Sequence, residues 1–355
     1  MSEKEISSHS HKCANCGDDM IFNPEKCDLI CPSCKCERAI KHNTNFTKHP
    51  YDKNANLTDK NDEWAKDNKI MKCPNCGASV LLAKYEVTAT CPYCTTPLIA
   101  NRSKTVALKP DAVIPFKFGV EKAEEYFKQK INQKFFAPRK FKRMVKASEI
   151  YAYYFPSFAY DANCSSSYSG KLYRDYTKTD SEGKTMTERR YFTINGNKST
   201  QHRNVQVEAS TKLTQEELES VLPYNYSAIV EFQSEYIAGY SLECYSSSLK
   251  ETHEISCDII KSQIKEIILN GYNYDGVSYL NVDTNFSEEK YSYCILPIYR
   301  INFTYKKKSY SNVLNGQTGA LGGKTPVSPW KVMLVVLIPL LLLALPIVLS
   351  LIVGK

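Results

Sequence analysis

The sequence lacks the motifs that mark the common catalytic sites. It contains no G-x-S-x-G, and the segment THEISC at 252–257 has no second histidine at the spacing that a zinc protease needs. The segment TGALGGKT at 318–325 looks like a phosphate-binding loop. However, Thr318 stands where that motif requires glycine, and Pro326 follows where a helix should begin. We therefore expect a protein that is not an enzyme.

An apolar stretch is also missing from the first residues, MSEKEISSHSHKCANC. Because a secretory signal needs such a stretch, we expect no cleavable signal peptide. Eight of the 14 cysteines form four C-x-x-C pairs, and thiolates that bind metal need a reducing compartment. The bulk of the chain is therefore expected in the cytoplasm.

The C-x-x-C pairs belong to two repeats, KCANCGDDMIFNPEKCDLICPSC at 12–34 and KCPNCGASVLLAKYEVTATCPYC at 72–94. In each repeat 14 residues separate the second cysteine from the third, a length that suits a short hairpin. Two residues between cysteines let one tight turn direct both sulfurs at the same ion, and two such turns complete a tetrahedral zinc site with no open position for water. The sequence therefore predicts two zinc ribbons with one structural Zn²⁺ each, held by Cys13, Cys16, Cys31 and Cys34 and by Cys73, Cys76, Cys91 and Cys94.

Glycine and proline stand next to the pairs where tight turns need them. Gly17 and Gly77 follow the first pair of each repeat, where glycine adopts a positive φ at little cost. Pro32 and Pro92 lie inside the second pairs. A module of this size cannot hold itself together by hydrophobic burial, so zinc would supply the free energy of folding.

Six cysteines and three nearby histidines lie outside the two quartets. Cys27 and Cys36 have no counterpart in the second repeat, and they are bystanders, spare ligands or replacements for a ligand of the first site. His9, His11 and His42 are either exposed polar residues or opportunistic ligands. Four single cysteines are expected to be small buried hydrophobic residues: Cys164, Cys244, Cys257 and Cys294.

One long hydrophobic run occupies residues 332–353 and contains no charged residue. About 20 apolar residues cross a hydrocarbon core of roughly 30 Å, and a transmembrane helix tolerates prolines such as Pro339 and Pro346. Basic residues gather on the N-terminal side of the run, and only Lys355 lies beyond it. The positive-inside rule therefore predicts a single-pass tail anchor in the cell membrane, with the N-terminal bulk in the cytoplasm.

The order of these features predicts six segments. They are a first zinc ribbon at 10–38, a flexible polar linker at 39–70, a second zinc ribbon at 71–100, an α+β cytosolic domain at 105–320, a Gly/Pro-rich spacer at 321–331 and a transmembrane helix at 332–353. The linker has few aliphatic residues, so we expect it to bury too little apolar surface to become ordered. The expected fold class is α+β, with a β-rich main domain.

Within the α+β domain, apolar spacing predicts helices over 120–136 and 248–270. The residues expected to face inward from the second helix are Ile255, Ile259, Ile264 and Ile267. Tyrosine-rich segments past residue 150 favour strands, and the dipeptide Asn195-Gly196 is expected to form the turn of a strand pair.

The densest basic run is RKFKRMVK at 139–146, with five positive charges in eight residues. It has three interpretations: contact with anionic lipid headgroups, contact with nucleic acid, or a solvated face. The predicted anchor favours lipid, because it would hold this run within reach of the bilayer.

Several segments resemble those of a known group of proteins. They are CPNCGA, CPYC, VIPFKF, APRKFK, YAYYFPSFAYD and YCILPIYRINFTYKKKSYSNVLNGQTGALGG. In these segments and in their order the chain resembles bacterial TFIIB-type zinc-ribbon-containing membrane proteins with a single C-terminal transmembrane helix. Some of those proteins bear a primosomal-helicase-like name, which does not carry over because this chain has no phosphate-binding loop and no room for two motor domains. The resemblance implies a membrane-tethered, non-enzymatic role, in some members alongside phage-shock-A-like or flotillin-like proteins of the envelope stress response.

The sequence therefore predicts a tail-anchored membrane adaptor that recruits cytosolic proteins, with phage-shock-A-like and flotillin-like proteins as candidate partners. The alternative is a membrane-tethered, nucleic-acid-binding zinc-ribbon protein, whose affinity would fall steeply with salt. The ribbons hold few basic or aromatic residues for phosphate or base contacts, which favours the adaptor. No small-molecule substrate is indicated.

Overall fold

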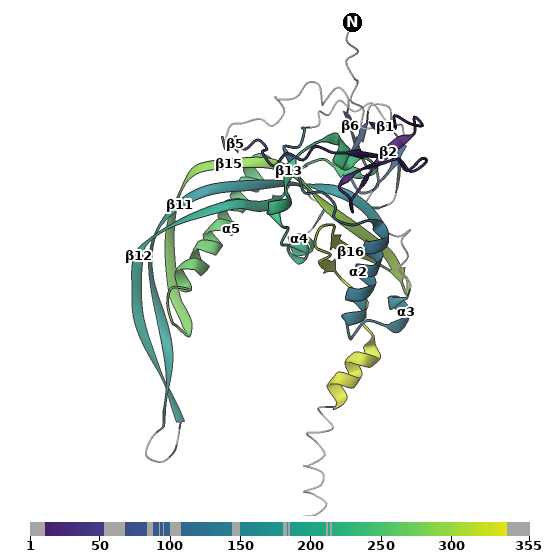
Figure 1. Ribbon diagram of the computed structural model, residues 1–355. Coiled ribbons are helices and arrows are strands. Elements are labelled where there is room, and N and C mark those ends of the chain that lie inside the picture. The colour runs from purple at the N-terminus through teal and green to yellow at the C-terminus, as the bar shows by residue number, and fades with distance from the viewer. Residues whose placement is uncertain are drawn as a thin grey trace, which may run out of the picture.

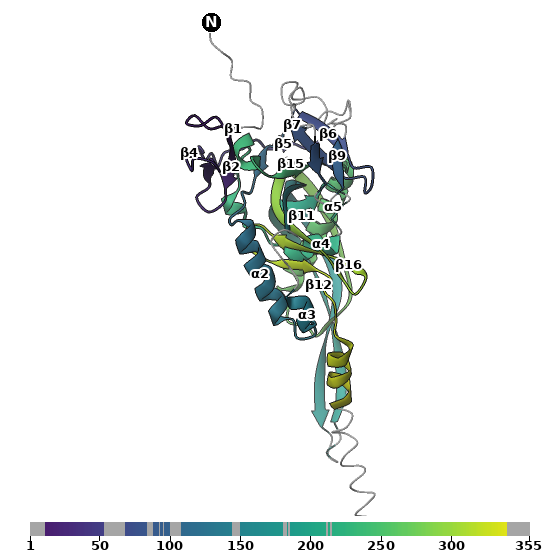
Figure 2. The ribbon, with the colours of Figure 1, turned by 90° about the vertical axis from the view of Figure 1, so that its right-hand side faces the viewer.

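A computed structural model describes residues 11–52, 68–83, 88–91, 93–94, 96–99, 108–143, 150–179, 183, 185–210, 212–213 and 215–338. In this part of the chain, two small cysteine-rich modules lie side by side at one end of a larger domain of strands and helices (Figures 1 and 2). The α+β class with two cysteine-rich modules and a β-rich main domain, predicted from the sequence, is confirmed.

The first module is a four-stranded antiparallel sheet in the order β1-β2-β3-β4. Its strands are β1 (His11–Lys12), β2 (Asp19–Asn23), β3 (Asp28–Ile30) and β4 (Glu37–Ala39). The second module consists of the hairpin β6 (Asn68–Lys72) and β7 (Ser79–Ala83) and the pair β8 (Thr88–Thr90) and β9 (Pro97–Ile99).

The larger domain is organised around a sheet whose main path is β13-β10-β15-β11-β14-β7-β6, with β12, β16, β17 and β5 paired onto it. The long strands are β11 (Ile150–Thr179), β12 (Thr185–Glu208) and β15 (Gly276–Tyr305). The shorter ones are β5 (His49–Pro50), β10 (Ala112–Val113), β13 (Val230–Glu231), β14 (Ser241–Glu243), β16 (Lys308–Asn315) and β17 (Leu321–Gly323).

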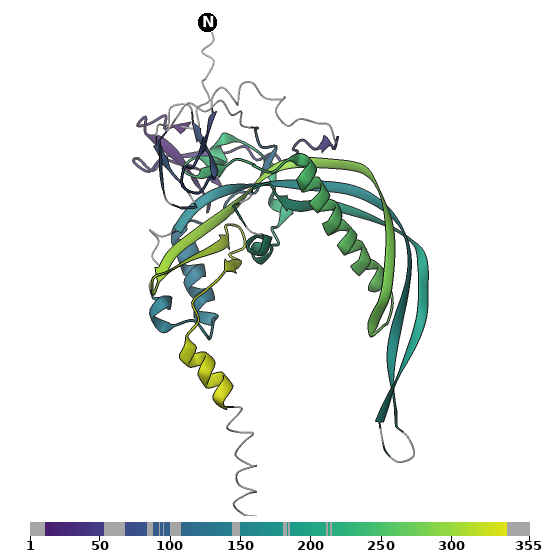
Figure 3. The same cartoon turned by 180° about the vertical axis from the view of Figure 1, so that it is seen from behind.

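The three long strands bend into an arch (Figures 1 and 3). Register shifts interrupt β11 at Tyr160/Ala162 and Asp161/Asn163, and such bulges bend and twist a strand. The turn expected at Asn195-Gly196 is not there, because both residues lie inside β12 and pair with Ser169 and Tyr168 of β11. The strand pair predicted around them is therefore one continuous strand, and β11 and β12 pair as far as Thr179 and Thr185.

The helix α5 (Leu249–Leu269) lies along the inner side of the arch (Figure 3). It begins at a capping box, in which the Ser248 hydroxyl accepts from the Glu251 amide and the Glu251 carboxylate accepts from the Ser248 amide. The helix predicted over 248–270 is thus present, but its expected inward face is wrong in part. Its buried residues are Leu249, Thr252, His253, Ser256, Ile260, Ile264 and Ile268, whereas Ile255 and Ile267 are 45% and 39% exposed.

Three shorter α-helices complete the larger domain: α2 (Val120–Gln133), α3 (Arg139–Lys142) and α4 (Gln215–Val221). The predicted helix over 120–136 corresponds to α2, which buries Ala123, Phe127 and Ile131. Two short 3₁₀ segments cover Tyr226–Ala228 (η2) and Ser234–Ile237 (η3). The phosphate-loop-like segment at 318–325 contains strand β17, which pairs with β16.

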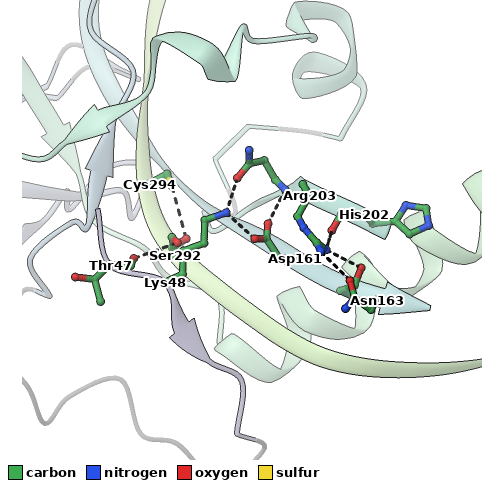
Figure 4. Close-up of polar contacts among 10 residues, drawn as sticks. Thr47, Lys48, Asp161, Asn163, His202, Arg203, Ser292 and Cys294 are labelled. Atoms are coloured by element: carbon green, nitrogen blue, oxygen red, sulfur yellow. Dashed lines mark hydrogen bonds and ion pairs between the residues drawn. The ribbon is translucent and has the colours of Figure 1, made fainter. Parts of the chain in front are cut away.

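Residues 40–52, the first part of the predicted flexible linker, pack along the larger domain. The Lys41 carbonyl accepts from the Gln233 amide side chain at 2.6 Å, and β5 pairs with β15. Figure 4 shows Lys48 beside Asp161, with its Nζ 2.6 Å from Asp161 Oδ2. The same Nζ donates to Asn204 Oδ1 at 3.3 Å. The segment is poor in aliphatic residues, and these hydrogen bonds with side chains and strands of the larger domain hold it in place instead. Residues 53–67 of the predicted linker lie outside the described residues.

The described C-terminal part ends in a helix at 329–338, which lies below α2 and α3 at the end of the molecule away from the ribbons (Figure 1). All seven residues from Val332 to Ile338 are exposed and apolar. No helix within the described residues is long and apolar enough to cross a membrane. Residues 339–353 of the predicted transmembrane helix lie outside the described residues.

Candidate metal centres

The eight cysteines predicted as metal ligands come together in two quartets, in each of which all four sulfurs lie within 4.8 Å of one another. The Sγ–Sγ distances are 3.5 Å for Cys13–Cys34 and 3.4 Å for Cys16–Cys31. The corresponding contacts Cys73–Cys94 and Cys76–Cys91 are both 3.5 Å.

These sulfur distances fit a metal centre and exclude disulfides. A disulfide bond is about 2.05 Å long, far shorter than the observed contacts. Four sulfurs at about 2.3 Å from a central ion form a tetrahedron with edges of roughly 3.8 Å, close to the observed distances. Each quartet can therefore hold one metal ion after small outward movements of its thiols.

Tight backbone turns direct the sulfurs inward. In the first turn of each module an amide four residues along donates to the cysteine carbonyl at 2.8 Å, from Gly17 to Cys13 and from Gly77 to Cys73. Both glycines have positive φ, +77° and +73°, as predicted. In the second turn of the first module the Lys35 amide donates to the Cys31 carbonyl at 3.0 Å, and Lys35 has a φ of +62°. A non-glycine residue therefore adopts the left-handed conformation there.

Hydrogen bonds and burial give the thiols of each quartet different pKa values. The Cys36 amide and the Asn15 side chain lower the pKa of Cys34 to about 6. Burial raises the pKa of Cys91, whereas at Cys94 the hydrogen bonds from Thr96 outweigh burial and lower the pKa to about 6. One thiol of each quartet is therefore ionised near neutral pH even without a cation, and a bound cation favours ionisation of the others.

The cysteines and histidines around the first quartet lie outside it. Cys27 has a φ of 57° and is half-buried between β2 and β3, and Cys36 is exposed beside the quartet. His11 lies 4.0 Å from Glu235, and His42 Nδ1 is 2.8 Å from the Tyr236 hydroxyl. Both histidines thus contact the larger domain. His9 lies outside the described residues.

Three of the four single cysteines are buried as expected: Cys164, Cys244 and Cys294. Cys257 differs, because it is half-buried and lies with His253 and Glu289 in a third group of potential ligands. Sequence reasoning missed this group because Glu289 comes from a distant strand. The spacing of His253 and Cys257, four residues apart on a helix, was the one local signal for it.

The second cysteine-rich module is joined to the larger domain through Tyr93, which lies in sequence between the candidate ligands Cys91 and Cys94. The Tyr93 hydroxyl donates to the carboxylate of Glu243, and the Arg300 guanidinium lies 4.7 Å from the centre of the Tyr93 ring. Glu243 and Arg300 are both buried. Burial raises the pKa of Glu243 to about 7, although Ser210 and Tyr93 donate to it.

Backbone contacts extend this junction. Asn302 Nδ2 donates to the Tyr93 carbonyl at 3.1 Å, and Lys212 Nζ donates to the Cys76 carbonyl. Strand β7 pairs with β14, with Leu81 opposite Leu242. The hairpin β6–β7 is therefore an edge of the main sheet, and the second ribbon is structurally continuous with the α+β domain.

The first ribbon docks through the strand β2. The Phe22 amide donates to the Ala238 carbonyl at 2.9 Å, and the buried Phe22 ring packs edge-on against Tyr236 and Tyr240. Gly239, with φ +84°, allows Ile21 to approach closely, since a Cβ there would lie 3.1 Å from the Ile21 side chain. The two modules are thus attached differently: the first by ring packing and a backbone hydrogen bond, the second by strand pairing and a buried polar junction.

These features define an α+β protein with two tetracysteine centres built against one arched sheet. In sequence the chain is similar to YdjG of Bacillus subtilis (strain 168), an uncharacterised protein. The two are 29% identical over 324 residues, which cover 91% of this chain and 92% of YdjG. No protein-family model and no solved structure matches the chain.

Proposed function

We propose that this protein is a non-enzymatic membrane adaptor, in which two structural zinc ribbons recruit cytosolic proteins and the C-terminal run 332–353 anchors the chain in the cell membrane. The observation that carries the proposal is the position of the two sulfur quartets at the end of the molecule opposite the helix at 329–338 (Figure 1). With the apolar run in a bilayer, the ribbons would face the cytoplasm and remain available to partners.

The donor set supports zinc as the metal and a structural role for it. Four thiolates in a tetrahedral arrangement suit Zn²⁺ and leave no position for a water molecule. When bound, zinc would supply folding free energy to modules too small to form a core. Cys13, Cys31, Cys73 and Cys91 are buried beneath the turns, as expected of centres that stabilise rather than react.

The surface around the start of the C-terminal helix supports the membrane anchor. Phe135 and Trp330 are 59% and 75% exposed there, and Phe136 is exposed beside them. The Lys331 ammonium donates to the carbonyls of Phe135 and Ala137, at 2.6 and 3.1 Å. Exposed aromatic rings at the end of an apolar run are typical of the membrane–water interface.

The basic helix α3 follows directly on this aromatic surface. Arg139 and Lys140 are exposed, and the pKa of Lys142 is lowered by burial and by the charge of Lys331. Basic residues next to an anchor attract anionic headgroups, at about 1 kcal/mol per residue. The described part of the basic run 139–146 lies near the start of the helix at 329–338, which supports lipid over nucleic acid as its partner.

The surface of the first ribbon favours protein partners over nucleic acid. Two of its four basic residues are offset by acidic ones: Lys12 pairs with Asp19 at 2.9 Å, and Lys26 pairs with Glu37. A nucleic-acid interface needs unpaired basic side chains that displace counterions from phosphates. By resemblance, phage-shock-A-like and flotillin-like proteins are candidate partners, and tethering raises the effective concentration for such weak contacts.

Site-specific photocrosslinking in intact cells tests the adaptor role. Deletion of the second ribbon is unsuitable, because β6 and β7 belong to the main sheet. A photoreactive residue replaces Arg38 in the first ribbon or Asn75 in the second, and Lys265 on α5 serves as the exposed control. We expect discrete membrane-dependent protein adducts from the ribbon positions and none from position 265. Adducts to nucleic acid, or the same adducts from all three positions, would refute the adaptor role.

A further inference from the structure

Three side chains of different chemistry converge beside the N-terminal half of α5, far from both sulfur quartets in the sequence. His253 and Cys257 lie one turn apart on the helix, and Glu289 comes from β15 beneath it. Their ligand atoms all lie within 4.8 Å of one another. The helix alone presents two donors on one face, and the sheet supplies the third.

The distances among these donors approach those of a tetrahedral metal site. Bonds of about 2.0 Å to nitrogen and 2.3 Å to sulfur place the two donor atoms roughly 3.5 Å apart. Cys257 Sγ lies 3.7 Å from His253 Nε2. Glu289 Oε2 now lies 2.6 Å from the same nitrogen, and it would move outward by roughly 0.7 Å to share an ion with it.

The geometry does not suit a thiol nucleophile paired with an imidazole base. Cys257 Sγ lies almost equally far from both ring nitrogens, 3.9 Å from Nδ1 and 3.7 Å from Nε2 of His253. A base that takes a thiol proton needs the sulfur in line with one ring nitrogen. Here Nε2 already faces Glu289 Oε2 at 2.6 Å, and the sulfur, nitrogen and oxygen atoms lie within 4.8 Å of one another.

Two aromatic rings hold the imidazole in place. The Tyr51 ring stacks on His253 with centroids 3.6 Å apart and an interplanar angle of 8°. The Tyr51 amide donates to the Glu289 carbonyl at 3.0 Å, which fixes the stack to β15. Tyr160 meets the His253 ring edge-on at 5.7 Å. The ring orientation is therefore set before any ligand arrives.

We infer that His253, Cys257 and Glu289 form a third metal site, which binds a divalent transition cation such as Zn²⁺ and leaves one coordination position open. A thiolate with an imidazole selects such ions over Mg²⁺ and Ca²⁺, which prefer oxygen donors alone. With three protein ligands rather than four thiolates, this site exchanges its metal more readily than the quartets. The open position accepts water or a side chain of a partner.

Metal at this site would also consolidate the docked N-terminal segment. Tyr51 follows β5, so the site joins that segment to α5 and β15. The inference is independent of the adaptor role, because it concerns a cluster that neither the ribbons nor the anchor use.

Equilibrium dialysis of the full-length chain in detergent, over a range of buffered free zinc, tests the site. The wild-type protein is expected to take up two tightly held zinc equivalents and then a third at higher free zinc. Cys257→Ser and Glu289→Gln are expected to lose the third step and keep the first two, which shows at the same time that these variants remain folded. Cys36→Ser and Glu254→Gln are the matched controls and are expected to retain all three.

Tyr51→Ala provides a second test, since it removes the ring that orients His253 and leaves every ligand in place. Outer-shell changes of this kind weaken metal binding by about 10- to 100-fold, so the third step is expected to move to higher free zinc by at least tenfold. The inference is overturned by a wild-type protein that saturates at two equivalents. It is equally overturned by a third step that survives in both Cys257→Ser and Glu289→Gln.

Discussion

Removal of a single hydroxyl, by Tyr93→Phe, probes the junction between the second ribbon and the α+β domain. The Tyr93 hydroxyl donates to Glu243, whose side chain is buried and also accepts from Ser210. The substitution keeps the ring against Arg300 and leaves the neighbouring cysteines Cys91 and Cys94 unchanged. It therefore isolates one hydrogen bond to a buried carboxylate.

The loss of stability is expected to depend on pH. A hydrogen bond to a charged group contributes about 1.5–3 kcal/mol and a neutral one about 1 kcal/mol. Burial raises the pKa of Glu243 to about 7 in the folded protein, above the value of about 4.3 for an exposed glutamate. A raised carboxyl pKa favours the folded state while Glu243 is protonated, and this contribution is lost as the pH rises through the folded pKa.

Tyr93→Phe raises the pKa of Glu243 further, because it removes a donor that favours the carboxylate. At about pH 8.5 we expect the variant to be less stable by roughly 2–3 kcal/mol. At about pH 6 Glu243 is protonated in both proteins, and the difference is expected to fall to roughly 1 kcal/mol.

Urea unfolding of the zinc-loaded protein, followed by near-ultraviolet circular dichroism at both pH values, measures the difference. The matched control is Tyr224→Phe, which removes a buried hydroxyl that donates to the neutral Pro297 carbonyl at 3.0 Å. Its cost is expected to be about 1 kcal/mol at both pH values. A Tyr93→Phe cost that is independent of pH, or equal to that of the control at about pH 8.5, would refute the reasoning about Glu243.

Three other perturbations test the remaining features. Ile264→Ala on the buried face of α5 is expected to lower the free energy of unfolding by about 2–5 kcal/mol, whereas Ile267→Ala on its exposed face should cost less than about 1 kcal/mol by urea denaturation. Removal of zinc by a chelator is expected to lower the thermal midpoint of the α+β domain as well as unfold the ribbons, because β6 and β7 are strands of its sheet; an unchanged midpoint by circular dichroism would contradict this continuity. Arg139→Gln combined with Lys140→Gln is expected to weaken binding of the full-length chain to vesicles with anionic lipid by about 2 kcal/mol in flotation assays, with no change on neutral vesicles; equal loss on both vesicle types would argue against headgroup contact.

The sulfur quartets could be predicted residue by residue because their geometry is local. Two residues between cysteines and a glycine after the first pair specify a tight turn, and the structure has that turn at Gly17 and Gly77. The helices α2 and α5 were predictable for the same reason. The spacing of their apolar residues and the cap at Ser248 involve only residues within one or two helical turns of one another.

Contacts between distant residues decided the rest. Asn195 and Gly196 would form a turn in an isolated hairpin, but β11 continues opposite them, so extended pairing prevails. The isoleucines of α5 are spread over two faces of the helix. The arched sheet buries the face that also carries His253 and Ser256, and hydrophobicity alone does not predict that choice.

The amino-acid sequence alone was therefore enough to predict the two sulfur quartets, the positions of the main helices and the apolar C-terminal run, because each depends on residues close together in the chain. The position of the second cysteine-rich module at an edge of the main sheet depends on the folded chain, since the β7–β14 pairing and the Tyr93 junction join residues more than 100 positions apart. The proximity of Glu289 to His253 and Cys257 likewise depends on the folded chain. A sequence pattern cannot specify such a meeting, because it depends on how the whole sheet bends.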